Sequence, residues 1–542
     1  MSLNTINRFS QYLSLLLQLL LILTKCVTNS NNNCLQNSNN LLVDSDCHQS
    51  DGKQTNSSYN QMKPDLSVHV LTWNVKSGQC KCDLSQLLDI SSLTNQSSDE
   101  QLADIYAIGL QEVAFKFGNI FFTEPWIETF DKLFKQLDYV RVKQIRLVGI
   151  VLMVYTKRSY LPRIKSVDVQ FTRTGLGGLW GNKGGVSVSL NFGGVSLCLV
   201  NSHLAPHYEN LDQRVADYNT IIDGQNFYNT KKPNILSHDY VIWIGDLNFR
   251  IDNLSGDEIH DIIMYANKHP DNDLRFEKLL ANDQLNRVRR EGRAFSEFNE
   301  SNISFAPTYK FFVNTDDYEY KARKPAFTDR VLYRYTSNAY EDFELKLRQL
   351  YYKSHPQYKQ SDHKPVSALF HLTTKASAHK ISKRYASLAL SGEEQALDGV
   401  PEDKEEEIFV TFHTISNWKI NNESIAWYTI SPNDEKTIAS LSQWDWIGLF
   451  KADFISIEDY LLFVWANTEP NRWSAPNFNQ TNVQQLDNSE DSTDTIASTR
   501  RQPWFSVQYP DNSLLIADKF RLVYVTQSGD VLGISDPFDI ID

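Results

Sequence analysis

The chain has 542 residues, of which 53 are basic and 66 are acidic, so its formal net charge is −13. Charged residues make up 22% and hydrophobic residues 41%, which are ordinary values for globular proteins and exclude global disorder and fibrous repeats. At about 150 residues per domain, the length predicts two to four domains. The acidic balance argues against a nucleic-acid partner, because contacts to a phosphate backbone need a basic surface.

Cysteine use points to a reducing compartment for the body of the protein. Five of the six cysteines lie within the first 82 residues. The sixth, Cys198, stands between Leu197 and Leu199 and is predicted to be a buried strand thiol. No CxxC pair is present to indicate structural zinc.

Residues 1–64 are predicted to be an apolar N-terminal segment followed by a disordered linker. The apolar stretch from Leu13 to Leu23 follows Arg8 and has the length of a signal-peptide core, which is short for a membrane span. A signal or membrane anchor, a disordered leader and a spurious start are all open interpretations. Residues 28–63 are rich in Asn, Ser, Gln and Asp, a composition typical of disorder.

Strand-like apolar runs alternate with helical stretches from residue 65 to residue 372. The first run, Leu66–Asn74, combines polar–apolar alternation with β-branched residues, which is the strand signature. Further strands are predicted at Tyr106–Leu110, Gly149–Tyr155, Gly185–Leu190, Val195–Ser202, Tyr240–Gly245 and Val366–Phe370. Helices are predicted at Glu124–Leu137 and Leu211–Phe227. This alternation indicates an α/β domain.

A second folded region follows a linker. Residues 373–405 are rich in Lys, Ser and Ala and then become strongly acidic, so they are predicted to be a linker. Residues 406–542 contain short β-rich runs separated by polar turns, at Ile408–Thr414, Trp446–Phe450, Tyr460–Trp465 and Phe520–Val525. Regularly spaced short strands with few helical periods predict an antiparallel β-sandwich.

Several predicted strands of the larger domain end in polar or ionisable side chains. These are Asn74, Gln111 with Glu112, His203, Asp246 with Asn248, and the Ser361-Asp-His363 segment that precedes the last strand. Taken singly, each is more typical of a turn, a solvated carboxylate or a structural histidine. If the strand ends meet at one edge, the combined side chains suit a hard divalent cation, a general base and phosphate-facing donors.

The order of the motifs decides between these interpretations. In chain order they are Thr72-Trp-Asn-Val75, Gln111-Glu112, Gly181-Asn-Lys-Gly-Gly-Val186, Asn201-Ser-His-Leu-Ala-Pro-His207, Trp243-Ile-Gly-Asp-Leu-Asn-Phe-Arg250, Pro307-Thr-Tyr-Lys-Phe311, Arg323-Lys-Pro-Ala-Phe-Thr-Asp-Arg330 and Ser361-Asp-His-Lys-Pro-Val366. This set closely resembles the inositol polyphosphate 5-phosphatases. The resemblance implies the DNase I-like four-layer α/β sandwich of the endonuclease/exonuclease/phosphatase superfamily for residues 65–372. One departure is Phe327-Thr328, where the family usually has Trp-Cys.

The resemblance also implies the residues of a metal site. Glu112 and Asn74 would hold Mg²⁺, and Asp362 would add to the metal environment. Phosphoryl transfer depends more on positioning and charge neutralisation than on covalent chemistry, so a divalent cation fits the reaction.

Catalytic roles follow from the same resemblance. Asp246 would orient and deprotonate the attacking water, and Asn248 would help to hold that water or the phosphoryl oxygens. His363, oriented by Asp329, and His203 would donate hydrogen bonds to the scissile phosphate. Water would attack directly and in line, without a phosphorylated residue.

Substrate choice is expected to depend on the basic loops. By resemblance, Tyr309, Lys310, Arg323 and Lys324 would bind the 4-phosphate, which neighbours the phosphate removed. Arg suits that role through its planar fork and Lys as a point charge. Lys183, in the glycine-rich turn, is either a phosphate contact or a surface residue of the turn. Concentration of these cations in short loops favours a compact charged headgroup over a polymer.

Residues 406–542 resemble the SKICH domain, a small β-sandwich that the family implies is used for targeting. The residues that carry the likeness are Trp444–Lys451, Tyr460–Trp465, Phe520–Val525 and Ser535–Phe538. A C-terminal SKICH domain is the arrangement of the muscle- and kidney-enriched and the proline-rich 5-phosphatases. The 17 prolines are scattered, so the chain is more similar to the former group.

The sequence therefore predicts a Mg²⁺-dependent phosphatase acting on PtdIns(4,5)P2, PtdIns(3,4,5)P3 and soluble inositol polyphosphates. Its expected partners are phosphoinositide lipids and, through the SKICH-like domain, proteins. Two other hypotheses are a related phosphodiesterase, such as a nuclease or sphingomyelinase, and an adaptor with an inert phosphatase domain. A cytoplasmic location at membrane surfaces, of the plasma membrane or the endoplasmic reticulum, is expected because phosphoinositide headgroups face the cytosol.

Overall fold

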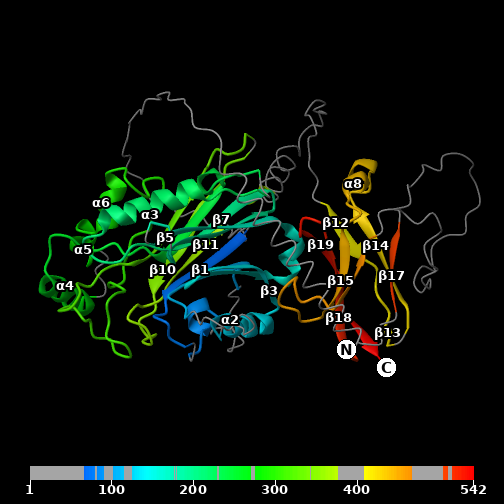
Figure 1. Cartoon of the computed structure of the whole chain (residues 1–542), viewed down its shortest axis with the longest axis horizontal. Helices are drawn as coiled ribbons and strands as arrows, with labels where there is room; N and C mark the ends of the chain where they lie inside the picture. The colour runs from blue at the N-terminus through cyan, green and yellow to red at the C-terminus, as the bar shows by residue number, and fades with distance from the viewer. Residues whose placement is uncertain are drawn as a thin grey trace, which may run out of the picture. The chain divides into compact units, whose positions relative to one another are not determined.

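The structure is a computed structural model, and it describes two folded regions of the chain (Figure 1). The described residues are 66–79, 82–90, 102–114, 125–175, 177–178, 180–228, 231–269, 275–341, 343–375, 408–420, 422–466, 504–510 and 516–541. The predicted N-terminal segment, its linker and residues 376–405 of the second linker lie outside these ranges. None of the helices in the described ranges combines the length and the apolar character that a bilayer crossing requires.

Two β-sheets form the centre of the larger domain. The first has the strand order β10-β11-β1-β2-β4-β3 and the second has the order β5-β6-β7-β8-β9. The first is built from β1 (Leu66–Asn74), β2 (Ile105–Gln111), β3 (Tyr139–Leu147), β4 (Ile150–Lys157), β10 (Leu347–Ser354) and β11 (Val366–Leu372). The second is built from β5 (Ile164–Gly175), β6 (Trp180–Phe192), β7 (Val195–His203), β8 (Tyr240–Asp246) and β9 (Asp329–Tyr335). The strands predicted from apolar runs are confirmed.

Apolar side chains of the two sheets meet in one buried cluster. Val70 and Ile105 of the first sheet and Val186 and Leu199 of the second belong to it, and each is at most 1% exposed. Because side chains alternate along a strand, the opposite faces of both sheets need their own cover. This requirement produces the outer helical layers.

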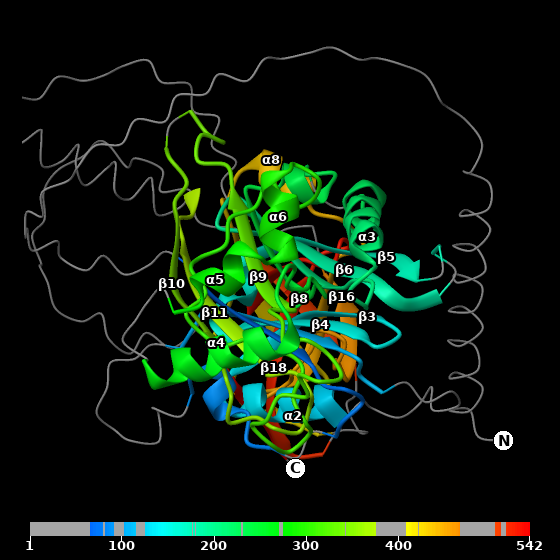
Figure 2. The same cartoon turned by 90° about the vertical axis from the view of Figure 1, so that its left-hand side faces the viewer.

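Helices pack around the two sheets. They are α2 (Pro125–Gln136), α3 (Leu211–Gly224), α4 (Gly256–Lys268), α5 (Glu277–Ala281) and α6 (Gln284–Arg290), with short 3₁₀ turns η1 (Ser85–Leu88), η3 (Arg158–Arg163) and η4 (Ile235–Ser237). Trp126, Phe130 and Phe134 of α2 share one helix face and pack on the first sheet. Tyr218 of α3 and Leu285 of α6 pack on the second. Figures 1 and 2 show α2 and α3 on opposite sides of the sheets, which confirms the predicted four-layer sandwich.

Both sheets contain one parallel strand pair, and these two pairs determine where polar strand ends meet. In the first sheet, β1 and β2 run parallel, with Asn74 beside Gln111. In the second, β7 and β8 run parallel, with His203 beside Asp246. Asn201 of β7 joins the sheets, since its Nδ2 donates to the Val151 carbonyl oxygen (2.8 Å) and its Oδ1 accepts from Gln111 Nε2 (2.6 Å).

The C-terminal region is a β-sandwich, as predicted. One sheet has the order β12-β14-β17, and the other has β13-β20-β18-β15-β16 with β19 beside β18. The described strands are β12 (Phe409–Phe412), β13 (Trp418–Lys419), β14 (Ser424–Ser431), β15 (Trp446–Lys451), β16 (Leu462–Trp465), β17 (Phe505–Tyr509), β18 (Asp518–Val525), β19 (Val531–Ile534) and β20 (Phe538–Ile541). Helix α8 (Glu435–Ser440) follows β14. Tyr428 and Phe505 of one sheet share a buried core with Leu449 and Tyr524 of the other.

Candidate active site

The second sheet brings three of the predicted catalytic side chains into adjacent register positions. Parallel pairing sets His203, at the end of β7, beside Asp246, at the end of β8. Antiparallel pairing sets Asp246 beside Asp329, the first residue of β9. Gly245 makes this possible, because its φ is +149° and a Cβ there would lie 2.0 Å from the Ser202 carbonyl oxygen.

His363 reaches the same place from the first sheet's side. The loop before β11 is held on β1, because Ser361 Oγ donates to the Asn74 carbonyl oxygen (2.6 Å) and Trp73 Nε1 donates to the His363 carbonyl oxygen (3.2 Å). Segments far apart in the chain are therefore joined where the two sheets meet.

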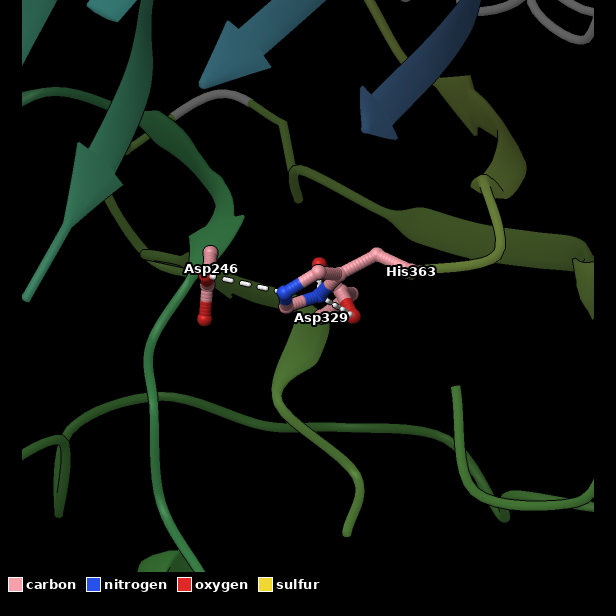
Figure 3. A group of neighbouring side chains, drawn as sticks. All are labelled: Asp246, Asp329 and His363. Carbon is pink, nitrogen blue, oxygen red and sulfur yellow. Dashed lines mark hydrogen bonds and ion pairs between the residues drawn. The ribbon is translucent and has the colours of Figure 1, made fainter. Parts of the chain in front are cut away.

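His363 lies between two carboxylates, as Figure 3 shows. Its Nδ1 is 2.9 Å from Asp329 Oδ2, and its Nε2 is 3.8 Å from Asp246 Oδ2. All three side chains are buried. Asp329 is held in turn by the hydroxyls of Thr308 (2.7 Å) and Thr328 (2.9 Å). The ring is thus fixed with Nε2 directed at Asp246.

The two carboxylates decide the charge of His363. Burial opposes the charged imidazolium, but Asp329 and Asp246 outweigh it and raise the pKa of His363 to about 9. For Asp246, burial favours the protonated form, yet His363, His203 and Lys183 hold its pKa well below the ordinary range. At neutral pH the site therefore presents an imidazolium donor beside a permanently ionised acceptor.

His203 has a different environment. Its Nε2 lies 3.3 Å from Asp246 Oδ2 and 4.0 Å from Glu112 Oε1, and the Lys183 ammonium lies 2.5 Å from the same nitrogen. Burial and the Lys183 charge lower the pKa of His203. Burial also lowers the pKa of Lys183, although Asp246 and Glu112 oppose that effect. Lys183, left open by the sequence as phosphate contact or surface residue, is therefore inside the site.

Of the residues predicted to hold a metal ion, Glu112 and Asp362 line the cavity, and their carboxylates suit a hard divalent cation. The Asn74 amide donates to Asp246 Oδ2 (3.0 Å), and the Glu112 carboxylate, 44% exposed, lies on the open side of that pair. Asp362 is less exposed, and its Oδ2 lies 3.1 Å from the Lys76 ammonium. Carboxylate and amide oxygens are the ligands that Mg²⁺ and Ca²⁺ prefer. Asp246, Asp329 and His363 also lie close enough together to share an ion, but His363 Nδ1 is already hydrogen-bonded to Asp329, and Asp246 Oδ2 accepts from the Asn74 amide.

The basic loops supply a separate group of donors. Tyr309 is buried, and Lys310 and Arg323 follow on the same rim. Glu319 pairs with Lys310, with 2.5 Å between carboxylate and ammonium. Lys324 is turned away, because its ammonium lies 5.1 Å from the centre of the Tyr208 ring and the residue is outside the cavity lining.

A cavity of about 280 Å³ connects these groups. Ten predicted residues line it: Glu112, Lys183, His203, Asp246, Asn248, Tyr309, Lys310, Arg323, Asp362 and His363. Asn74 and Asp329 stand behind the lining and hold Asp246 and His363. Four further lining residues have no role predicted from the sequence: Lys76, Pro206, His207 and Arg250. Three of the four stand inside quoted motifs and Lys76 directly follows one, and that position was the available signal.

The departure at Phe327-Thr328 is accommodated in the site. Phe327 is fully buried and makes edge-on contacts with Phe276 and Phe305, so packing is preserved. Thr328 Oγ1 donates to Asp329 Oδ2 at 2.9 Å and lies 3.3 Å from His363 Nδ1. The hydroxyl therefore replaces a thiol with a stronger donor to the carboxylate that orients His363.

Family models match two segments of the chain. Residues 71–369 match "Endonuclease/Exonuclease/phosphatase family 2", and residues 410–540 match "SKICH domain". These segments lie inside the two folded regions described above.

Individual proteins are also similar to the chain. It is 34% identical to inositol polyphosphate 5-phosphatase K of Mus musculus over 444 residues, which cover 79% of this chain and 85% of that protein. It is 34% identical to phosphatidylinositol 4,5-bisphosphate 5-phosphatase A of Mus musculus over 419 residues, which cover 75% of this chain but 37% of that protein. A solved inositol polyphosphate 5-phosphatase domain of SPsynaptojanin, in complex with inositol (1,4)-bisphosphate and calcium, is 31% identical. It covers 60% of this chain and 92% of the solved one, with a TM-score of 0.47.

Proposed function

Since the chain belongs to the endonuclease/exonuclease/phosphatase family 2, and within it to the inositol polyphosphate 5-phosphatases, we propose that it removes the 5-phosphate of phosphoinositides with the help of Mg²⁺. Phosphatases of this family are metal dependent. The proposed substrates are PtdIns(4,5)P2, PtdIns(3,4,5)P3 and soluble inositol polyphosphates.

One observation carries the proposal. The His363 imidazolium, clamped by Asp329, and the Asp246 carboxylate open on the same cavity as Lys183, Lys310 and Arg323. A phosphomonoester has close to two negative charges, so cationic donors must surround it, while an acceptor is needed for the attacking water. The cavity has both, a short distance apart.

Mg²⁺, held by Glu112 with Asn74 and Asp362 nearby, would neutralise phosphoryl charge and polarise water when bound. Asp246 accepts a hydrogen bond from the attacking water and orients it towards phosphorus. His363 donates from Nε2 to a phosphoryl oxygen, since its Nδ1 is committed to Asp329. A low pKa makes Asp246 a weak base, so its main contribution is orientation and charge.

Asp246→Asn tests the reaction. With Mg²⁺ and short-chain PtdIns(4,5)P2, phosphate release should fall by about 10²-fold or more, a loss typical of a removed catalytic group. Asp261→Asn, at a carboxylate of α4 that is 86% exposed, should keep the wild-type rate. Equal rates for wild type and Asp246→Asn would refute the proposal.

The alternatives give different results in the same assay. A phosphodiesterase would cleave DNA or sphingomyelin at a rate that Lys310→Ala leaves unchanged, because Lys310 would have no phosphate to bind. An inert adaptor would release no phosphate from any substrate, even as wild type. No observation in the site favours either alternative.

We further propose a cytoplasmic enzyme at the surface of the plasma membrane or endoplasmic reticulum, with protein partners bound through the SKICH-like domain. The support is chemical, because the proposed lipid headgroups face the cytosol. Protease treatment of intact microsomes tests the location. Digestion of the chain without detergent is the expected result, and full protection would contradict it.

A further inference from the structure

The ring of Tyr309 contacts two groups that belong to the catalytic machinery or touch it. The Arg250 guanidinium carbon lies 4.6 Å from the ring centre. The His363 ring lies 4.5 Å away, centre to centre, at 39°. Tyr309, Arg250 and His363 are each less than 9% exposed, so water has little access to this stack. Desolvation strengthens a cation–π contact.

Arg250 also hydrogen-bonds to both the backbone and the side chain of Asn248. Its Nε donates to the Asn248 carbonyl oxygen (3.0 Å), and its Nη2 donates to Asn248 Oδ1 (2.5 Å). The Asn248 Nδ2 donates to the Leu204 carbonyl oxygen (3.1 Å), so both ends of the amide are held. Asn248 has a φ of +57°, a left-handed conformation in which external contacts are needed to keep a residue in place.

One guanidinium therefore joins two functions. Its planar fork orients the catalytic amide, while its face contacts the aromatic ring expected at the 4-phosphate. Arg250 also lines the cavity. Movement of Tyr309 would thus be transmitted to Asn248 through Arg250 and to His363 by direct contact.

We propose that Arg250 is a positioning residue that couples occupation of the Tyr309 loop by the neighbouring phosphate to the alignment of Asn248. The inference rests on the proposed function. It predicts that a substrate with a 4-phosphate is turned over faster, and not only bound more tightly. The reason is that its phosphate holds Tyr309 in contact with Arg250 and His363.

Arg250→Met tests the coupling with two short-chain substrates, PtdIns(4,5)P2 and PtdIns(5)P. For PtdIns(4,5)P2, kcat should fall by about 10-fold or more while KM changes less than about threefold, the signature of a contact realised in the transition state. The kcat ratio of the two substrates should fall towards one. A rise of KM with unchanged kcat would overturn the inference, since Arg250 would then be only a binding charge.

Arg250→Lys separates geometry from charge. Lysine keeps the positive charge but lacks the planar fork, so kcat should stay low. Full rescue by lysine would overturn the proposal. Arg163→Met is the matched control, because Arg163 lies over Tyr160 and Phe192 (5.2 and 4.7 Å from the ring centres) but outside the cavity. It should leave both rates unchanged.

A stability cycle keeps this test apart from that of the proposed function. Thermal unfolding of Arg250→Met, Tyr309→Leu and the double variant should show non-additive effects, as residues in contact do. If the losses of stability in the two single variants simply add in the double variant, the contact between Arg250 and Tyr309 does not contribute to stability and the inference is refuted. If wild type released no phosphate from either lipid while the cycle stayed non-additive, the proposed function would fail and the stack would stand without its catalytic role.

Discussion

His363 keeps its proton because two buried carboxylates flank it, and its charge sets a limit on the pH at which the site works. With a pKa of about 9, the imidazolium donor persists through neutral pH and is lost above it. We expect kcat for PtdIns(4,5)P2 to be flat near pH 7.5 and to fall about tenfold per pH unit well above 9. A kcat–pH profile with saturating substrate measures this directly.

Asp329→Asn is the matched variant, because Asp329 is the carboxylate bonded to His363 Nδ1. It removes the larger of the charges that raise the pKa, so the alkaline fall should begin at a lower pH. If the alkaline fall of kcat begins at the same pH in Asp329→Asn as in wild type, a group other than His363 causes it. The raised pKa also stabilises the folded state fully below pH 6.5, and that contribution is lost as the pH rises through about 9.

At the scale of one element, β8 depends on a glycine just before its catalytic residue. A Cβ at Gly245 would lie 2.0 Å from the Ser202 carbonyl oxygen, at a φ of +149°. Gly245→Ala must therefore separate β7 from β8, and we expect a loss of roughly 3 kcal/mol in unfolding free energy from overpacking and strain. Urea denaturation followed by circular dichroism measures the loss.

Gly292→Ala is the control, because Gly292 also has a positive φ (+67°) but no atom within 4 Å of a Cβ. Its cost should be about 1 kcal/mol, from backbone strain alone. Similar losses for both variants would mean that the β7–β8 contact does not decide the outcome.

His69 in the middle of β1 predicts acid sensitivity of the first sheet. Burial lowers its pKa to about 3, although Asp89 opposes this, and Lys353 and His355 add to it. The folded state thus binds fewer protons than the unfolded state below pH 6.5, so stability falls as the pH drops from 6.5 towards 3. His69→Phe should flatten the dependence of the urea midpoint between pH 7 and 5. An unchanged slope would contradict the assignment.

At the scale of the whole molecule, the site needs both sheets in contact. Gly109 of β2 is where they approach closely, since a Cβ there would lie 2.7 Å from Ile244 Cδ1 and 2.8 Å from Asn201 Cγ. Gly109→Val should cost about 1–3 kcal/mol by overpacking. It should also lower phosphate release under native conditions, because His203 and Asp246 follow Asn201 and Ile244. Gly109→Ala should have a smaller effect on both, and normal activity in a destabilised valine variant would refute the link.

The central strands of this molecule could be predicted because they are buried on both faces. β1, β2, β7 and β8 are buried at every position; β2, β7 and β8 were predicted from apolar runs, and β1 from its alternation and β-branched residues. The edge strands β3, β5 and β10 were missed, since charged and apolar residues mix along them. β9 was not predicted as a strand; only its first two residues, Asp329 and Arg330, were noted, as the end of the Arg323–Arg330 motif.

The site was predicted at the strand ends and less well on the loops. Asp246 and His203 have positions fixed by strand register, so the sequence order located them. Arg250 and Lys324 depend on the path of a loop. The chain turns at this point, with the backbone N–H groups of Ala322 and Arg323 both donating to the Glu319 carbonyl oxygen, and Arg323 lines the cavity while Lys324 lies on Tyr208.

The hydrogen bond from Ser361 Oγ to the Asn74 carbonyl oxygen joins residues that are 287 positions apart in the chain. Closing so long a loop carries an entropic penalty that nearby contacts do not have, and high contact order slows folding. After dilution from denaturant, secondary structure should therefore return before β11 joins β1. Turnover of substrate would be the last property to recover, and its lag would time the joining of the two ends of the catalytic domain.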